Sequence, residues 1–260
     1  MGWIEESAGV VDALGETDFP KVLTDALRSV VPFEYTVIFA YYQDLKPLDV
    51  YDDFSKSKRR VMVDDYQEGP YLLDPLYLHS TPLIEPRLTR LRDLAPDRFY
   101  QSEYFRNYYV QTGLAEEIGF MVDVGDGVTV VISAMREHKV FSAREFRDLK
   151  ALFPFVDACS RRHWKGLISQ FADRPEVEGP RLAVLIEQAF QSVGGNLLTP
   201  REAEIVEYAL KGHSAEATGK ALGISPGTVR IHRRNIYAKL QIRSQGELFS
   251  LFISTLAKLS

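Results

Sequence analysis

Apolar residues recur with helical spacing at several places in the first 171 positions of the chain. This pattern predicts helices over 19–31, 55–67 and 102–112. A fourth helix begins at Ser142, where Glu145 three residues later completes a capping box, and is expected to run to about Phe171.

Runs of β-forming residues lie between these helices. They predict strands over 34–43, 48–51, 115–124 and 128–135, with Gly125-Asp126-Gly127 as a hairpin turn. The proline-rich stretch 70–99 is expected to be irregular. Helices before and after a mostly antiparallel sheet, without β-α alternation, predict an α+β fold class with an α-β-α layered first domain.

The composition of the chain changes between Phe171 and Leu198. A polar stretch rich in proline and glycine is followed by a short apolar helical pattern over 182–190. We therefore expect a first domain over 1–171, a linker with a short helix over 172–196, and a second domain over 197–260.

The second domain has clear start and stop signals for helices. Thr199-Pro200-Arg201-Glu202 is a helix start, and Ser225-Pro226 is another, with proline at the first helical position in each. A short helix over 214–222 ends at the tight turn Gly223-Ile224. Two short helices joined by a glycine turn predict a helix-turn-helix.

The helix that starts at Ser225 can be divided into faces at about 100° per residue. Val229, Ile236 and Leu240 fall on one stripe, which is expected to be buried. Arginine can donate two hydrogen bonds to guanine, and an aliphatic side chain can contact a thymine methyl, so the opposite face suits DNA. The alternative is a solvated basic helix. The candidate DNA contacts lie on and beside the face opposite the buried stripe. They are Thr228, Arg230, Ile231, His232, Arg233, Arg234 and Lys239.

These motifs resemble the LuxR-type helix-turn-helix. The resemblance runs from Leu198-Thr199-Pro200-Arg201-Glu202 through Gly223-Ile224-Ser225-Pro226-Gly227-Thr228-Val229-Arg230 to Lys239-Leu240. It implies a four-helix module whose last helix spans 244–259, with base contacts from Arg230, Ile231 and Arg234. Ala217-Thr218-Gly219 stands where the family has an acid, isoleucine and alanine, which predicts a looser first helix of the motif.

The first domain resembles the autoinducer-binding domain of LuxR-type quorum-sensing regulators. Asp74 before Pro75 and Tyr66 match the aspartate and tyrosine that hold the polar head of an acyl-homoserine lactone in that family. Val61 and Met62 occupy the region where the family has a tryptophan. Because of this departure, the expected ligand is either an acyl-homoserine lactone or another small organic molecule. Core packing is the alternative for the aromatic residues, and a turn role for Asp74. The candidate ligand-binding residues are Tyr66, Tyr71, Asp74, Tyr104, Phe105 and Ser133.

Charge and composition agree with this division. The formal net charge is −5, but residues 196–260 carry 9 basic and 5 acidic side chains, whereas residues 1–195 carry 22 basic and 31 acidic ones. Only residues 196–260 therefore have the positive net charge that favours binding to a polyanion. The single cysteine, Cys159, excludes a disulfide framework and a cysteine-based zinc site. The chain has no membrane-spanning run and no secretion signal, which predicts a cytoplasmic protein.

We expect a ligand-responsive, sequence-specific transcriptional regulator of quorum-sensing-like type, with no cofactor and no catalytic or metal site. Its expected partners are double-stranded DNA with an inverted-repeat operator, a second copy of the chain and a small-molecule effector, with RNA polymerase as a further candidate. One alternative is a ligand-independent regulator whose first domain serves only dimerisation or protein contacts. Another is an enzyme or interaction module with a DNA anchor, although no catalytic constellation or Gly-Lys-Ser/Thr phosphate loop stands in the sequence.

Overall fold

The computed structural model describes residues 3–43, 45–81, 83, 85–102, 104–172 and 198–259. The short helix expected over 182–190 lies outside these residues. The chain divides into two compact units. Unit 1 comprises Met1–Arg60, Leu76–Leu94 and Gly113–Glu178, and unit 2 comprises Val61–Pro75, Ala95–Thr112 and Gly179–Ser260.

Unit 1 is built on a five-stranded antiparallel sheet with the order β2-β1-β5-β4-β3. The strands are β1 (Tyr35–Tyr42), β2 (Leu48–Asp52), β3 (Arg87–Arg90), β4 (Glu116–Gly125) and β5 (Val128–Arg136). Four of them lie where the sequence predicts. β3 was missed, because the stretch 70–99 was expected to be irregular.

The hairpin between β4 and β5 turns through three residues with positive φ: Gly125 at 97°, Asp126 at 54° and Gly127 at 77°. This left-handed backbone is what glycine and aspartate tolerate best, which confirms the predicted turn.

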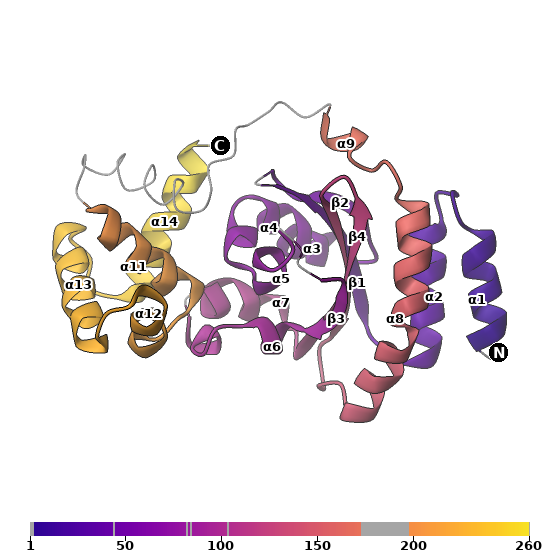
Figure 1. Ribbon diagram of the computed structural model, residues 1–260, viewed down its shortest axis with the longest axis horizontal. Helices are drawn as coiled ribbons and strands as arrows, with labels where there is room; N and C mark the ends of the chain where they lie inside the picture. The colour runs from indigo at the N-terminus through magenta and orange to yellow at the C-terminus, as the bar shows by residue number, and fades with distance from the viewer. Residues whose placement is uncertain are drawn as a thin grey trace. The chain divides into compact units, whose positions relative to one another are not determined.

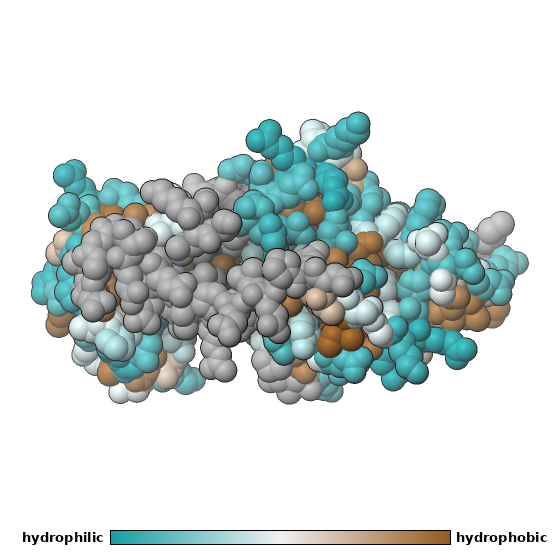
Figure 2. Space-filling view, turned by 90° about the horizontal axis from the view of Figure 1, so that it is seen from above, coloured by the Kyte–Doolittle hydropathy of each residue, from teal (hydrophilic) through white to brown (hydrophobic). Residues whose placement is uncertain are grey.

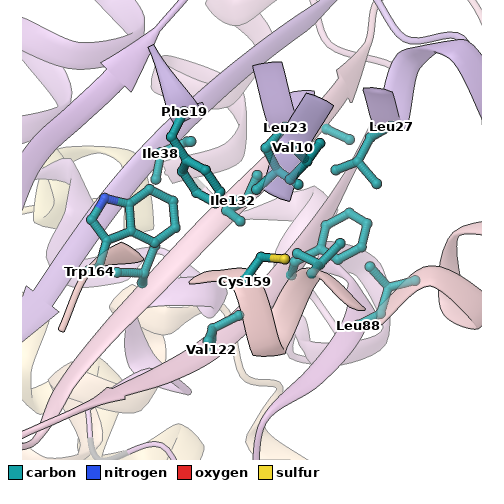
Figure 3. Close-up of a cluster of buried hydrophobic side chains, with 14 of the residues drawn as sticks. Val10, Phe19, Leu23, Leu27, Ile38, Leu88, Val122, Ile132, Cys159 and Trp164 are labelled. Carbon is teal, nitrogen blue, oxygen red and sulfur yellow. The ribbon is translucent and has the colours of Figure 1, made fainter. Parts of the chain in front are cut away.

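Two helices, α2 (Phe19–Val30) and α8 (Ala143–His163), cover one face of the sheet, and α1 (Trp3–Asp12) packs on their outer side (Figure 1). Figure 3 shows their side chains meeting those of the strands, with Leu23 of α2 and Cys159 of α8 close to Ile132 of β5. On the other face, α5 (Pro75–Leu78) brings Leu76 against Gly119 and stacks Tyr77 edge-on to Tyr41 of β1, with ring centroids 5.4 Å apart. Both faces are therefore covered, which confirms the α-β-α layers.

One helix prediction for unit 1 needs correction, and one helix was missed. The long helix ends at His163 rather than at about Phe171, because the chain turns at residues 164–168, where Gly166 has a φ of +80°. The short helix α9 (Ser169–Ala172) follows. The helix α1 was not predicted at all.

The remaining short elements interrupt what the sequence presents as continuous helices. The stretch 55–67 becomes α3 (Lys56–Arg59), the π-helical turn η1 (Arg60–Asp64) and α4 (Asp65–Gln67), and 102–112 becomes the π-helical turn η4 (Phe105–Tyr109) and α7 (Val110–Thr112). Both lie where helix was predicted, but with wider turns. The 3₁₀ turns η2 (Pro70–Leu73) and η3 (Phe99–Gln101) and the helix α6 (Leu91–Leu94) complete this part of the chain.

The last four helices of unit 2 are α11 (Pro200–Lys211), α12 (Ala215–Leu222), α13 (Pro226–Lys239) and α14 (Gln245–Leu259). Thr199, Ser214 and Ser225 each accept a hydrogen bond from the backbone N–H three residues later, which satisfies the open first turn of α11, α12 and α13. Gly212 and Gly223 end α11 and α12 in the left-handed conformation. All four helices begin within one residue of their predicted start.

Figure 2 shows hydrophilic side chains over much of the visible face, with separate hydrophobic areas between them. Among the helices of the described ranges, none has the length and hydropathy needed to span a membrane.

Candidate nucleic-acid interface and ligand site

The two faces of α13 differ as the helical spacing predicts. Val229, Ile236 and Leu240 are 0%, 1% and 6% exposed and pack into the four-helix core. On the opposite face Arg230, Ile231 and Arg234 are all exposed, and Ile231 is 52% exposed. This exposed face therefore presents two guanidinium groups, which donate hydrogen bonds, and one apolar side chain, and both kinds of group can contact a binding partner.

α12 packs closely against the start of α13. A Cβ atom on Gly219 would lie 2.7 Å from the carbonyl oxygen of Ile224, so only glycine fits there without a shift of the backbone. The Thr218 side chain is fully buried, and its hydroxyl donates to the Ser214 carbonyl at 2.7 Å. Gly219 and Thr218, two of the three departures from the family pattern, are thus used in packing, and the looser first helix of the motif stays a prediction.

Two of the other predicted DNA contacts, Thr228 and Arg233, have protein partners. Arg233 is half-buried, and its Nη2 donates to the His213 carbonyl at 2.8 Å. Burial lowers the pKa of this guanidinium. Thr228 is half-buried at the start of α13, with its hydroxyl 2.8 Å from that of Ser225, and His232 is half-buried as well.

Lys239 connects α13 to α11 through Glu202. Its Nζ lies 2.6 Å from Oε2 of Glu202, a buried carboxylate that also forms the capping box with Thr199. Burial raises the pKa of Glu202, but the hydrogen bonds from Lys239 and Thr199 outweigh burial and hold the pKa below its ordinary value. From the sequence, Glu202 was expected only to cap α11, and its ion pair with Lys239 was missed.

One acidic residue beside the exposed face was missed as well. Glu216, in the first turn of α12, forms an ion pair with Nη2 of Arg230. A hydrogen bond to its own backbone N–H and the charge of Arg230 both lower the pKa of the Glu216 carboxyl, which keeps it ionised. The sequence signal that could have identified Glu216 is its place as an acidic residue in the first turn of α12, the first helix of the helix-turn-helix.

The candidate ligand residues of unit 2 fall into two clusters. In the first, the Tyr66 hydroxyl donates to Oδ2 of Asp74 at 2.7 Å, both side chains are buried, and the Tyr71 ring lies edge-on at 6.2 Å from that of Tyr66. Asp74 stands between η2 and α5 in the extended conformation that a residue before proline favours. The structure thus brings Tyr66, Tyr71 and Asp74 together.

The second cluster surrounds Phe99, which sequence reasoning missed. The rings of Tyr104 and Phe105 both lie 5.7 Å from the ring of Phe99, and Tyr109 stacks on Phe105 at 5.2 Å. Phe99 is 1% exposed, so this is a packed aromatic group.

Ser133 lies in unit 1, on the central strand β5. It is buried opposite Val37 of β1 and Gly119 of β4, and its carbonyl accepts from the Thr36 hydroxyl at 2.8 Å. Within the part of the chain that the structure describes, no group of three or more His, Cys, Asp or Glu side chains could hold a metal ion.

Comparisons with known proteins give a consistent picture. The family described as "Bacterial regulatory proteins, luxR family" matches residues 196–252. A putative HTH-type transcriptional regulator in the exeN 3' region of Aeromonas salmonicida is 39% identical over 159 residues, which are 59% of this chain and 80% of that protein. The monoamine regulon transcriptional regulator of Klebsiella aerogenes is 22% identical over 225 residues, 86% of each protein.

Among solved structures, the LBD domain of VqsR from Pseudomonas aeruginosa is similar in fold. The TM-score is 0.55 at 23% sequence identity, and the match covers 62% of this chain and 95% of that domain. At this identity the likeness concerns the fold alone.

Proposed function

The chain belongs to the luxR family of bacterial regulatory proteins, and from this premise we propose that it recognises specific DNA sequences through the exposed face of α13. The observation that carries the proposal is the placement of Arg230, Ile231 and Arg234 on one exposed face, opposite the buried stripe of the same helix. In a helix-turn-helix this is the face that enters the major groove.

The chemistry of these three side chains fits base edges. Each arginine can donate two hydrogen bonds to O6 and N7 of a guanine, and Ile231 can contact a thymine methyl. We further propose that two copies bind together, so that their recognition helices lie about 34 Å apart and read an inverted repeat. RNA polymerase is a candidate partner at such a site, and the cytoplasm is the proposed location.

The first 171 residues are proposed to bind a small organic molecule and so make the regulator responsive, in the manner of quorum sensing. The fold similarity to the LBD domain of VqsR supports this, as does the buried pair of Tyr66 and Asp74. A buried carboxylate and a phenol hydroxyl can bind the N–H and carbonyl groups of a polar head, with aromatic side chains beside them, as an acyl-homoserine lactone would require. The ligand acts only if it binds one conformation of the protein better than another.

DNA recognition is tested with the purified full-length chain. Duplexes selected by the protein from a random library serve as the operator, and affinity is measured by fluorescence anisotropy. Arg230→Ala and Arg234→Ala are each expected to weaken operator binding by about 1–3 kcal/mol and to relax specificity. Arg243→Ala, which removes an exposed arginine just after α13, is the matched control. Equal losses for all three variants, or equal losses on operator and random DNA, would contradict base recognition.

A ligand-independent regulator is the second candidate, because the Asp74 carboxylate already accepts a hydrogen bond from Tyr66. Thermal denaturation of wild type and Asp74→Ala in the presence of a library of lactones, amines and carboxylic acids separates the two. A ligand that raises the melting temperature of wild type but not of the variant supports sensing. If no compound raises the melting temperature of wild type, ligand independence is favoured.

A further inference from the structure

The ion pair between Glu216 and Arg230 joins the two helices of the helix-turn-helix. Glu216 lies in the first turn of α12, Arg230 lies in α13, and their side chains are 57% and 62% exposed. In the part of the chain that the structure describes, no acidic side chain pairs with Arg234, the other arginine of the face. The two predicted base-reading arginines therefore have different surroundings.

The geometry of the pair leaves Arg230 able to bind DNA. Glu216 contacts Nη2 of the guanidinium, so Nη1 and Nε remain available as donors. A guanidinium held at one nitrogen has fewer orientations than a free one, so less conformational entropy is lost when it donates to a base.

The carboxylate affects the two kinds of DNA acceptor differently. O6 and N7 of guanine carry no net charge, so Arg230 can donate to them and to Glu216 together. A phosphate is an anion, and bringing it to the same guanidinium places it beside the Glu216 carboxylate, which repels it. Contacts with phosphate supply most of the affinity for non-specific DNA.

We propose that Glu216 is a specificity-determining residue that positions Arg230 for a guanine edge and opposes contact between Arg230 and phosphate. This inference rests on the proposed function of α13. Glu216 acts through Arg230, and its removal should therefore increase binding to random DNA more than binding to the operator.

The test compares Glu216→Gln with wild type on the selected operator and on a random-sequence duplex of equal length, over a series of salt concentrations. Gln keeps an oxygen that can accept from the residue's own backbone N–H. Glu204→Gln is the matched control, because Glu204 is an exposed acid of α11 paired with Arg201. Circular dichroism melts show whether each variant remains folded.

Glu216→Gln is expected to tighten binding to random DNA about two- to fivefold, the range of a solvent-exposed ion pair. Its affinity for the operator should stay unchanged or fall, so that the ratio of the two affinities falls by at least the same factor. On random DNA the slope of log affinity against log salt should steepen by about 0.9, as for one additional phosphate contact. Glu204→Gln should leave the ratio of affinities unchanged.

A double-mutant cycle shows whether Glu216 acts through Arg230. The effect of Glu216→Gln on the affinity ratio should disappear in an Arg230→Ala background and persist in an Arg234→Ala background. An equal gain on both DNAs, or an effect that persists without Arg230, means general charge repulsion and overturns the inference. If wild type prefers no DNA sequence, the proposed function itself fails. If wild type does prefer one but the ratio does not change, only the role of Glu216 is refuted.

Discussion

Glu145 at the start of α8 provides a quantitative test of how unit 1 is held together. Its carboxylate accepts from the guanidinium of Arg136 at 2.7 and 3.2 Å and from the backbone N–H of Ser142 at 2.7 Å. Arg136 lies on the central strand β5 and is 1% exposed. Glu145→Gln removes the negative charge but keeps an oxygen that can cap the helix, so the perturbation is confined to the ion pair.

The expected loss follows from the pKa of Glu145. The hydrogen bond from Arg136, followed by those from Ser142, lowers this pKa from 4.5 to about 2. At about 1.36 kcal/mol per unit, the full difference is worth about 3.4 kcal/mol. Glu145 is 26% exposed, so solvent screening reduces this figure. We expect Glu145→Gln to lower the free energy of unfolding by about 2 kcal/mol at pH 7.

The sign of the pH dependence is fixed by the direction of the pKa shift. Because the folded pKa lies below the unfolded one, the carboxylate stabilises the protein above pH 4.5, and this contribution is lost as the pH falls toward 2. Wild type and variant should therefore differ fully at pH 7, less at pH 3.5 and very little near pH 2.

Tryptophan fluorescence in a urea titration reports the unfolding of unit 1, because both tryptophans, Trp3 and Trp164, belong to it. Asp148→Asn, which removes the acid of an exposed ion pair on the same helix, is the control and should cost less than about 0.5 kcal/mol. An equal midpoint for wild type and Glu145→Gln at pH 7 would refute the reasoning. So would a loss that stays the same from pH 7 to pH 3.

Three further predictions concern unit 2. Gly219→Val should destabilise the C-terminal helices by about 1–3 kcal/mol in a circular dichroism melt, because the new Cβ would meet the Ile224 carbonyl. The control Gly223→Ala introduces only backbone strain and should cost about 1 kcal/mol in the same measurement. Thr199→Ala removes the helix cap of α11 and should cost about 1 kcal/mol, whereas Thr199→Ser should cost little. Tyr66→Phe should lower the melting temperature of the ligand-free chain, because the buried Asp74 carboxylate loses a hydrogen bond, and an unchanged temperature would show that this bond does not contribute.

The helices of the DNA-binding module were predictable because their signals are local. Thr199, Ser214 and Ser225 each mark a helix start within four residues, and the faces of α13 follow from spacing alone. The pairing of Glu216 with Arg230 joins residues 14 positions apart across a turn, and no local pattern reports it.

Unit 1 was less predictable where its elements depend on distant partners. β3 is four residues long and contains Arg87 and Arg90, so it lacks the apolar character of a strand. It forms because it pairs with β4 and because the Arg90 guanidinium makes an ion pair with the buried Glu116 carboxylate. The candidate ligand residues were grouped by family resemblance. The structure supplies a hydrogen bond between Tyr66 and Asp74, which sequence spacing does not reveal.

The order of the strands has a consequence for how the chain is made. β1 is synthesised early, but one of its two edges pairs with β5 along its whole length, from Tyr35 opposite Met135 to Tyr42 opposite Val128. This pairing cannot form until β5 has been synthesised. At about 5–20 residues per second, a ribosome needs several seconds to supply the missing strand. Throughout that interval the backbone N–H and C=O groups of β1 that face β5 have no strand partner, and its side chains are largely apolar. Unpaired strands of this kind promote aggregation. The yield of native protein should therefore depend on chaperone supply during translation.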